Sequence, residues 1–146
     1  MDINAQISTY INTQDTTKSD DMKILHETII GINPSCKLWF LDGKNSENKV
    51  VSNPNIGYGT YQIKYKDGKS KDFYQIGMSA NTSGISIYIF GIEDKKFLIE
   101  NFGKKIGKAS VTGYCIKFKS LKHIDLTTLI EAIKVGFNGA ATIGKK

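Results

Sequence analysis

The spacing of apolar residues predicts two helices at the beginning of the chain. The first carries isoleucines at intervals of four, which places them on one side of a short helix: Ile3, Ile7 and Ile11. After a polar stretch at 13–19, a second helix is expected to begin where Ser19 or Asp20 caps it and to end at Gly31. Its expected buried side repeats the helical spacing: Met22, Leu25 and Ile29.

Beyond Cys36 the pattern changes to short extended stretches separated by turn residues. Five strands are expected, at 37–41, 57–65, 72–78, 85–90 and 113–119. Alternation assigns their faces: the three isoleucines of 85–90 point one way, and Tyr88 and Phe90 point the other way. Consecutive strands joined by short turns, such as Asp67-Gly68, predict an antiparallel meander.

The last third of the chain predicts one more strand between two helices. A short helix is expected over 93–101, with Gly103 as its C-cap. In the strand at 113–119, one face is expected to hold Tyr114, Ile116 and Phe118. Asp125 is expected to cap the final helix, whose apolar residues follow a helical spacing: Leu126, Leu129, Ile130 and Ile133. The tail at 138–146 is expected to fray.

This order of elements predicts an α+β fold, in which helices cover one face of an antiparallel sheet of about five strands. The 146 residues fit a single domain at 1–146, with its core at about 20–137. No apolar stretch approaches the ~20 residues of a membrane span. The chain also begins without the basic and apolar segments of a secretory signal. We therefore expect a cytoplasmic protein that does not enter a membrane.

The chain is lysine-rich, and its charge narrows the choice of partners. The net charge is +6, and all 20 basic residues are lysines. A positive net charge favours anionic partners. However, arginine is the usual side chain for bidentate recognition of guanine or phosphate, and this chain has none. The composition therefore disfavours sequence-specific recognition of nucleic acid.

The segment at 103–110 resembles a phosphate-binding P-loop but fails in its details. Only three residues separate Gly103 from Gly107, and Ala109 stands where the motif needs Ser or Thr. A helix is also expected before this loop instead of after it. The pair Gly57 and Gly59 lacks the third glycine of a dinucleotide fingerprint. We interpret both segments as structural, and we expect no cofactor.

Candidates for metal binding and nucleophilic catalysis are few. Cys36 with His26, and Cys115 with His123, are conceivable thiol–imidazole pairs, but no spacing in the sequence brings either pair together. No CxxC pair or histidine ligand set indicates a metal site. Because buried cysteines are common, we expect two reduced structural thiols and no catalytic residue.

Two further groups of residues are candidates for binding. One is a group of lysines in a single segment, which we interpret as a solvated edge in preference to a nonspecific nucleic-acid surface: Lys104, Lys105, Lys108, Lys117, Lys119 and Lys122. The other is a set of strand aromatics, which we take as the candidate ligand-binding residues: Trp39, Tyr58, Tyr61, Tyr88 and Phe90.

Several short motifs together resemble the YdhG-like family, domain of unknown function 1801 (DUF1801). They are "IGYGTYQIKY" from Ile56, "GISIYIF" from Gly84, "IGKASVTGYCIKFKSL" from Ile106 and "HIDLTTLIEAI" from His123. The resemblance implies a compact α+β domain, frataxin-like in shape, and raises iron handling as an activity. The chain departs from a frataxin-type acidic ridge, because its net charge is positive and Asp2 is the only acidic residue of its first predicted helix.

These observations predict a small binding or interaction module without catalytic activity. Its partner is expected to be a small molecule or another protein, and a homodimer is a second option. The first alternative is a frataxin-type protein that binds and delivers iron. The second alternative is a cysteine-dependent enzyme.

Overall fold

A computed structural model describes residues 2–90, 92 and 94–143. Two helices precede the strands, α1 (Ile3–Asn12) and α2 (Thr16–Ile32). After the central strands come α3 (Phe97–Phe102), a further pair of strands, the 3-10 turn η1 (Leu121–His123) and α4 (Leu126–Ile143). The predicted order of helix, helix, strands, helix, strand and helix is confirmed, except that two strands lie between α3 and α4 where one was expected.

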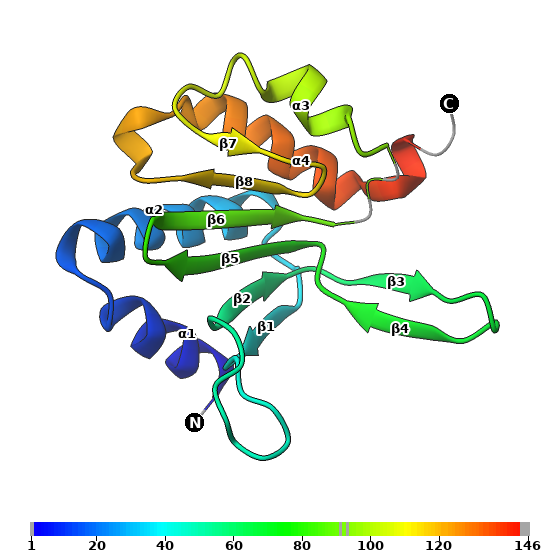
Figure 1. Cartoon of the computed structure of the whole chain (residues 1–146), viewed down its shortest axis with the longest axis horizontal. Coiled ribbons are helices and arrows are strands. Elements are labelled where there is room, and N and C mark those ends of the chain that lie inside the picture. Colours follow the sequence, from blue (N-terminus) through cyan, green and yellow to red (C-terminus); the bar gives the residue numbers. More distant parts are fainter. Residues whose placement is uncertain (1, 91, 93, 144–146) are drawn as a thin grey trace.

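Six strands form one antiparallel sheet. In order across the sheet they are β1 (Leu38–Leu41), β2 (Asn55–Tyr58), β5 (Ile76–Asn81), β6 (Gly84–Ile89), β8 (Cys115–Phe118) and β7 (Ser110–Val111). Two further strands, β3 (Tyr61–Lys64) and β4 (Ser70–Phe73), pair only with each other, and Figure 1 shows them projecting beyond the main sheet. The α+β class and the antiparallel sheet are confirmed.

The helices lie on one face of the main sheet. In Figure 1, α2 and α4 run behind the strands, and contacts join α2 to β6 and α4 to both β5 and β6. The three isoleucines of β6 are fully buried under these helices. Close contact is achieved at Gly136 of α4, where a Cβ atom would overlap Ile76 and Ile89. Tyr88 and Phe90 lie on the opposite face, as alternation predicts.

The boundaries of α2 differ from the prediction at both ends. Asp15, not Ser19 or Asp20, is the N-cap, and its carboxylate accepts a hydrogen bond from the backbone N–H of Lys18 at 3.0 Å. The helix continues through Gly31 and ends at Ile32, one residue beyond the predicted end. Most of the stretch at 13–19 that was expected to be a loop is therefore helical.

Two of the predicted strands are interrupted where the chain leaves the main sheet. The stretch at 57–65 divides into β2 and β3 at Gly59, whose φ of +79° is costly for any other residue. The stretch at 72–78 divides into β4 and β5, between Phe73 and Ile76. A hydrogen bond of 3.0 Å from the Gln75 N–H to the Tyr58 carbonyl joins the two interruptions.

The last two helices follow the prediction in part. Leu98 and Phe102 of α3 are buried as expected, but the helix begins only at Phe97, and residue 93 lies outside the described residues. Asp125 precedes α4 and accepts a hydrogen bond from the Thr127 N–H at 3.1 Å. The helix continues through Ile143, residues 144–146 lie outside the described part, and the expected fraying of the tail stays a prediction.

Candidate functional site

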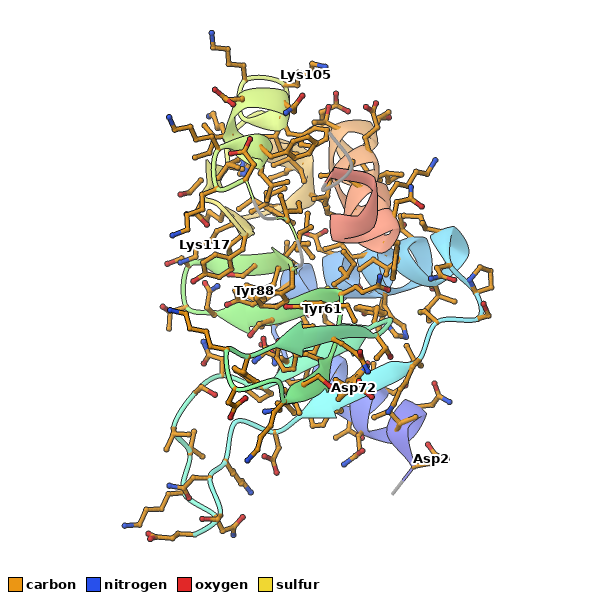
Figure 2. The ribbon with its side chains drawn as sticks, turned by 90° about the vertical axis from the view of Figure 1, so that its right-hand side faces the viewer. Asp2, Tyr61, Asp72, Tyr88, Lys105 and Lys117 are labelled. Atoms are coloured by element: carbon orange, nitrogen blue, oxygen red, sulfur yellow. The ribbon has the colours of Figure 1, made fainter. Side chains whose placement is uncertain are left out.

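An aromatic row crosses the face of the sheet that the helices leave uncovered. We define the aromatic row by six residues: Trp39, Phe73, Tyr74, Phe90, Tyr88 and Tyr114. Each ring contacts the next, beginning with Trp39 and Phe73 at a centroid distance of 6.4 Å and ending with Tyr88 and Tyr114 at 6.2 Å. Figure 2 shows Tyr88 on the side of the sheet opposite α2 and α4. The row therefore spans the sheet from β1 to β8.

Tyr74 fills the centre of the row because two strands leave space for its ring. Gly57 of β2 and Gly77 of β5 are direct partners across the sheet, and a Cβ atom on either would overlap the Tyr74 ring. The ring consequently lies on the backbone of both strands, and Tyr74 is only 3% exposed. Burial raises the pKa of Tyr74 to about 12, and the nearby phenols of Tyr88 and Tyr61 contribute to the shift.

At the β8 end of the row, three rings form a cluster of nearly parallel planes. Tyr88, Phe90 and Tyr114 are tilted from one another by 10° to 19°, and their centroids are between 5.9 and 6.2 Å apart. Three rings in one column would place the outer two nearly twice as far apart as each neighbouring pair. Since all three distances are equal within 0.3 Å, at least two of the rings must lie side by side.

The uncovered face is apolar, partly accessible and bordered by lysines. Tyr114 is 54% exposed, and Tyr88 and Phe90 are half-buried. The six strands of the main sheet contain no Asp or Glu, and Lys117 of β8 is their only charged residue. At the β1 end, the Lys37 ammonium lies 4.4 Å from the centroid of the Trp39 ring, close enough for a cation–π contact.

The structure brings most of the predicted site residues together. Trp39, Tyr88 and Phe90 belong to the aromatic row. Tyr61 is half-buried and pairs with Phe73 across β3 and β4, which places it beside the row. Tyr58 does not share this face, because it is fully buried among the helices.

Three members of the row were missed from the sequence. Phe73 and Tyr74 lie where β4 gives way to β5, so neither follows the alternation expected of one continuous strand. Tyr114 was predicted to lie with Ile116 and Phe118, and this is wrong because β8 begins only at Cys115. The paired glycines of β2 and β5 were the available signal, since they leave a hollow that suits a ring from a neighbouring segment.

Tyr58 joins His26 and Cys36 in a separate cluster under the helices. The Tyr58 hydroxyl lies 2.7 Å from Nδ1 of His26, in hydrogen-bonding contact. Burial raises the pKa of Tyr58 well above its usual value and lowers the pKa of His26, against an opposing effect of Glu27. Burial also raises the pKa of the Cys36 thiol. A raised pKa disfavours the thiolate that nucleophilic catalysis requires.

The second cysteine has no more activation than the first. Cys115 is buried on the aromatic side of β8, and burial raises its pKa although Lys117 acts in the opposite direction. His123, the imidazole considered as its partner, lies in η1, where its carbonyl accepts a hydrogen bond from the Lys108 N–H at 3.0 Å. Within residues 2–90, 92 and 94–143, no three His, Cys, Asp or Glu side chains gather as metal ligands.

The lysines predicted to form one edge are distributed over separate surfaces. Lys117 lies on the uncovered face, whereas Lys105 follows α3 at the far end of the molecule in Figure 2. Lys119 and Lys122 line a shallow polar depression that also includes Lys18. The Lys18 ammonium is already engaged there, donating a hydrogen bond of 2.8 Å to the Asn81 carbonyl.

Comparison of the chain with known protein families, curated proteins and solved structures finds no match. In the part of the chain that the structure describes, none of the helices is both long enough and apolar enough to cross a membrane. Function is therefore inferred from the residues of this chain alone.

Proposed function

We propose that this chain is a binding module and that the aromatic row is its binding surface. One observation carries the proposal: an unbroken series of ring contacts crosses the helix-free face and ends at Tyr114, a large side chain that is 54% exposed. Exposed aromatic groups that gather in one place mark interaction sites more often than isolated ones do. Tyrosine and tryptophan are also enriched among residues that dominate binding energies.

The chemistry of the row suits recognition and not bond-making. Its members offer π faces, ring edges and phenolic hydroxyls, and the raised pKa of Tyr74 favours its neutral form at physiological pH. Planar or apolar ligands fit such a surface through stacking and burial. The resemblance to the YdhG-like family and a cytoplasmic location remain part of this proposal, but they add no chemistry to it.

The two alternatives have weaker support. A frataxin-type iron function remains a prediction without an assigned site, because the described residues offer no cluster of three or more metal ligands. A cysteine-dependent enzyme would need a thiolate, and burial raises the pKa of both Cys36 and Cys115.

The proposal is tested with anilinonaphthalene sulfonate, a planar aromatic anion whose fluorescence increases against apolar rings. We expect it to bind the native protein and to shift the backbone amide resonances of β6 and β8. Tyr88→Ala should keep the fold, as judged by circular dichroism and the thermal midpoint, and abolish this binding. Tyr65→Ala, which removes a tyrosine that is 50% exposed outside the row, is the matched control.

Two results would contradict the proposal. Amide shifts confined to another region, such as the depression beside Ile99 and Val111, would place the binding surface elsewhere. Unfolding of Tyr88→Ala would make Tyr88 a structural residue. In that case Tyr114→Ala, which changes the most exposed ring of the row, provides the second test.

A further inference from the structure

We propose that the ligand of the aromatic row is single-stranded nucleic acid, bound without sequence preference. This inference rests on the proposed function, because it assigns a ligand class to the same surface. It requires two things of the molecule: ring faces on which bases stack, and cations placed to meet the phosphates between them.

The ring faces are supplied by the cluster of Tyr88, Phe90 and Tyr114. Their planes agree within 19°, and the equal separations of their centroids require at least two rings to lie side by side. Two aromatic rings that lie side by side can each stack with one base, and an unpaired strand offers neighbouring bases for this stacking. Every base has a π face, so stacking on these rings is tolerant of sequence.

The cations stand at the two ends of the row. Lys37 lies over Trp39 at the β1 end, and Lys117 projects from β8 on the side that carries Tyr88 (Figure 2). Four strand-to-strand steps separate β1 from β8, so the row is about 19 Å long at the usual spacing of about 4.8 Å. That length suits a few nucleotides, near the lower end of the site sizes of about 4–16 nucleotides known for single-strand binders.

The charges on this face favour an anion over the other candidate partners. The strands of the main sheet offer no carboxylate, so two copies placed face to face would bring lysines together without acidic partners on those strands. Duplex DNA keeps its bases stacked inside, where the rings of a flat sheet do not reach them. The chain also lacks the arginines that usually read base edges from a groove.

The test measures the fluorescence anisotropy of a labelled twelve-nucleotide oligothymidylate titrated with the full chain. We expect saturable binding that is at least about fivefold weaker for Tyr114→Ala, the smallest loss that stacking of one base on one ring explains. The matched control Tyr65→Ala should bind as the native chain does. Its tyrosine is similarly exposed, at 50% against 54%, but lies outside the row.

A second pair of variants tests the cation. Lys117→Gln should flatten the plot of log affinity against log salt concentration by about 0.7, the contribution of one phosphate contact on a single strand. Lys105→Gln removes the same charge from the far end of the molecule and should leave the slope unchanged (Figure 2). Equal effects of both variants would mean attraction by net charge alone and would overturn the inference.

Three further results would overturn the inference. Equal or tighter binding of the corresponding duplex would exclude stacking of unpaired bases. A native chain that sediments as a dimer, and that Tyr114→Ala dissociates, would make the row a subunit interface. Binding of anilinonaphthalene sulfonate to β6 and β8 without binding of the oligonucleotide would leave the binding surface in place and remove its assigned ligand. Failure of both probes would remove the proposed function as well.

Discussion

The two faces of β6 come from one short sequence but differ in almost every physical respect. Ile85, Ile87 and Ile89 are fully buried beneath α2 and α4, whereas Tyr88 and Phe90 are half-buried on the face without helices. One face is closed by other elements of the fold. The other carries aromatic rings that contact one another. The difference teaches that the residues that form the core and the residues that we propose for binding are separated here by the alternation of one strand.

The tyrosines of the sheet show the same contrast within one residue type. Tyr58, on the covered face, has its hydroxyl in contact with His26 and is completely buried. Tyr114, on the uncovered face, leaves 54% of its surface to solvent. A tyrosine in this sheet therefore acts as a core residue or as a surface residue according to the face on which it lies.

The largest effect is expected from shortening a side chain on the covered face. Ile87→Ala removes a fully buried side chain and should lower the free energy of unfolding by about 2–5 kcal/mol. Ser86→Ala, one residue away on the other face, is the comparison: it removes a buried hydroxyl that accepts a hydrogen bond of 2.8 Å from Asn81 Nδ2, and it should cost about 1 kcal/mol. Urea denaturation measures both variants, and a similar loss for the two would contradict the division of roles between the faces.

A smaller loss is expected when the uncovered face loses its central ring. Gly57→Ala places a Cβ atom against Tyr74 and should cost about 1–3 kcal/mol by displacing that ring. In Gly31→Ala the new Cβ atom meets nothing within 4 Å on α2. In that control the free energy of unfolding should rise by about 0.5–1 kcal/mol, because alanine has a higher helix propensity than glycine. An unchanged midpoint of urea denaturation for Gly57→Ala would show that the position of the Tyr74 ring does not depend on the paired glycines.

The contrast between tyrosines predicts an effect of about 1 kcal/mol, the usual net contribution of a hydrogen bond. Tyr58→Phe removes the hydroxyl that lies 2.7 Å from His26 Nδ1 and should lower the thermal midpoint. Tyr114→Phe removes a hydroxyl from a side chain that is 54% exposed and should change the midpoint little. Equal shifts in the two variants would mean that the contact with His26 adds no stability.

The last effect appears only at alkaline pH. The pKa of Tyr74 is about 12 in the folded chain, whereas the ordinary pKa of a tyrosine is 10.0. Between these two pH values the unfolded state releases a proton that the folded state retains, so stability falls as pH rises. Tyr74→Phe should make this fall shallower, and Tyr65→Phe serves as the control. Urea denaturation at increasing pH measures the slope, and an unchanged slope in Tyr74→Phe would contradict the assignment.

The sequence predicted the covered face better than the uncovered one. Strict alternation identified the isoleucines of β6, and helical spacing identified Met22, Leu25 and Ile29 of α2, all of which are buried. Both patterns are local, because the residues that face the core recur along the sequence with the period of their own helix or strand. The α+β class followed from the same patterns.

The aromatic row was found only in part, because its geometry depends on where strands end. The break at Gly59 separates Tyr58 from Tyr61, and the break before Ile76 frees Phe73 and Tyr74 from alternation. A positive φ at Gly59 and a hydrogen bond from Trp39 Nε1 to the Gly59 carbonyl at 2.8 Å fix the first break. Such long-range contacts leave no periodic signal in the sequence.

The separate hairpin of β3 and β4 is expected to unfold locally more often than the main sheet does. A hairpin of two strands is marginal by itself, and these strands share no ladder with the main sheet. Their backbone amides should therefore exchange with solvent hydrogen before those of β5 and β6. When the hairpin opens, Phe73 leaves with it, while Tyr88 and Phe90 remain on the main sheet. We therefore expect a ligand that contacts all six rings to bind only while the hairpin is closed.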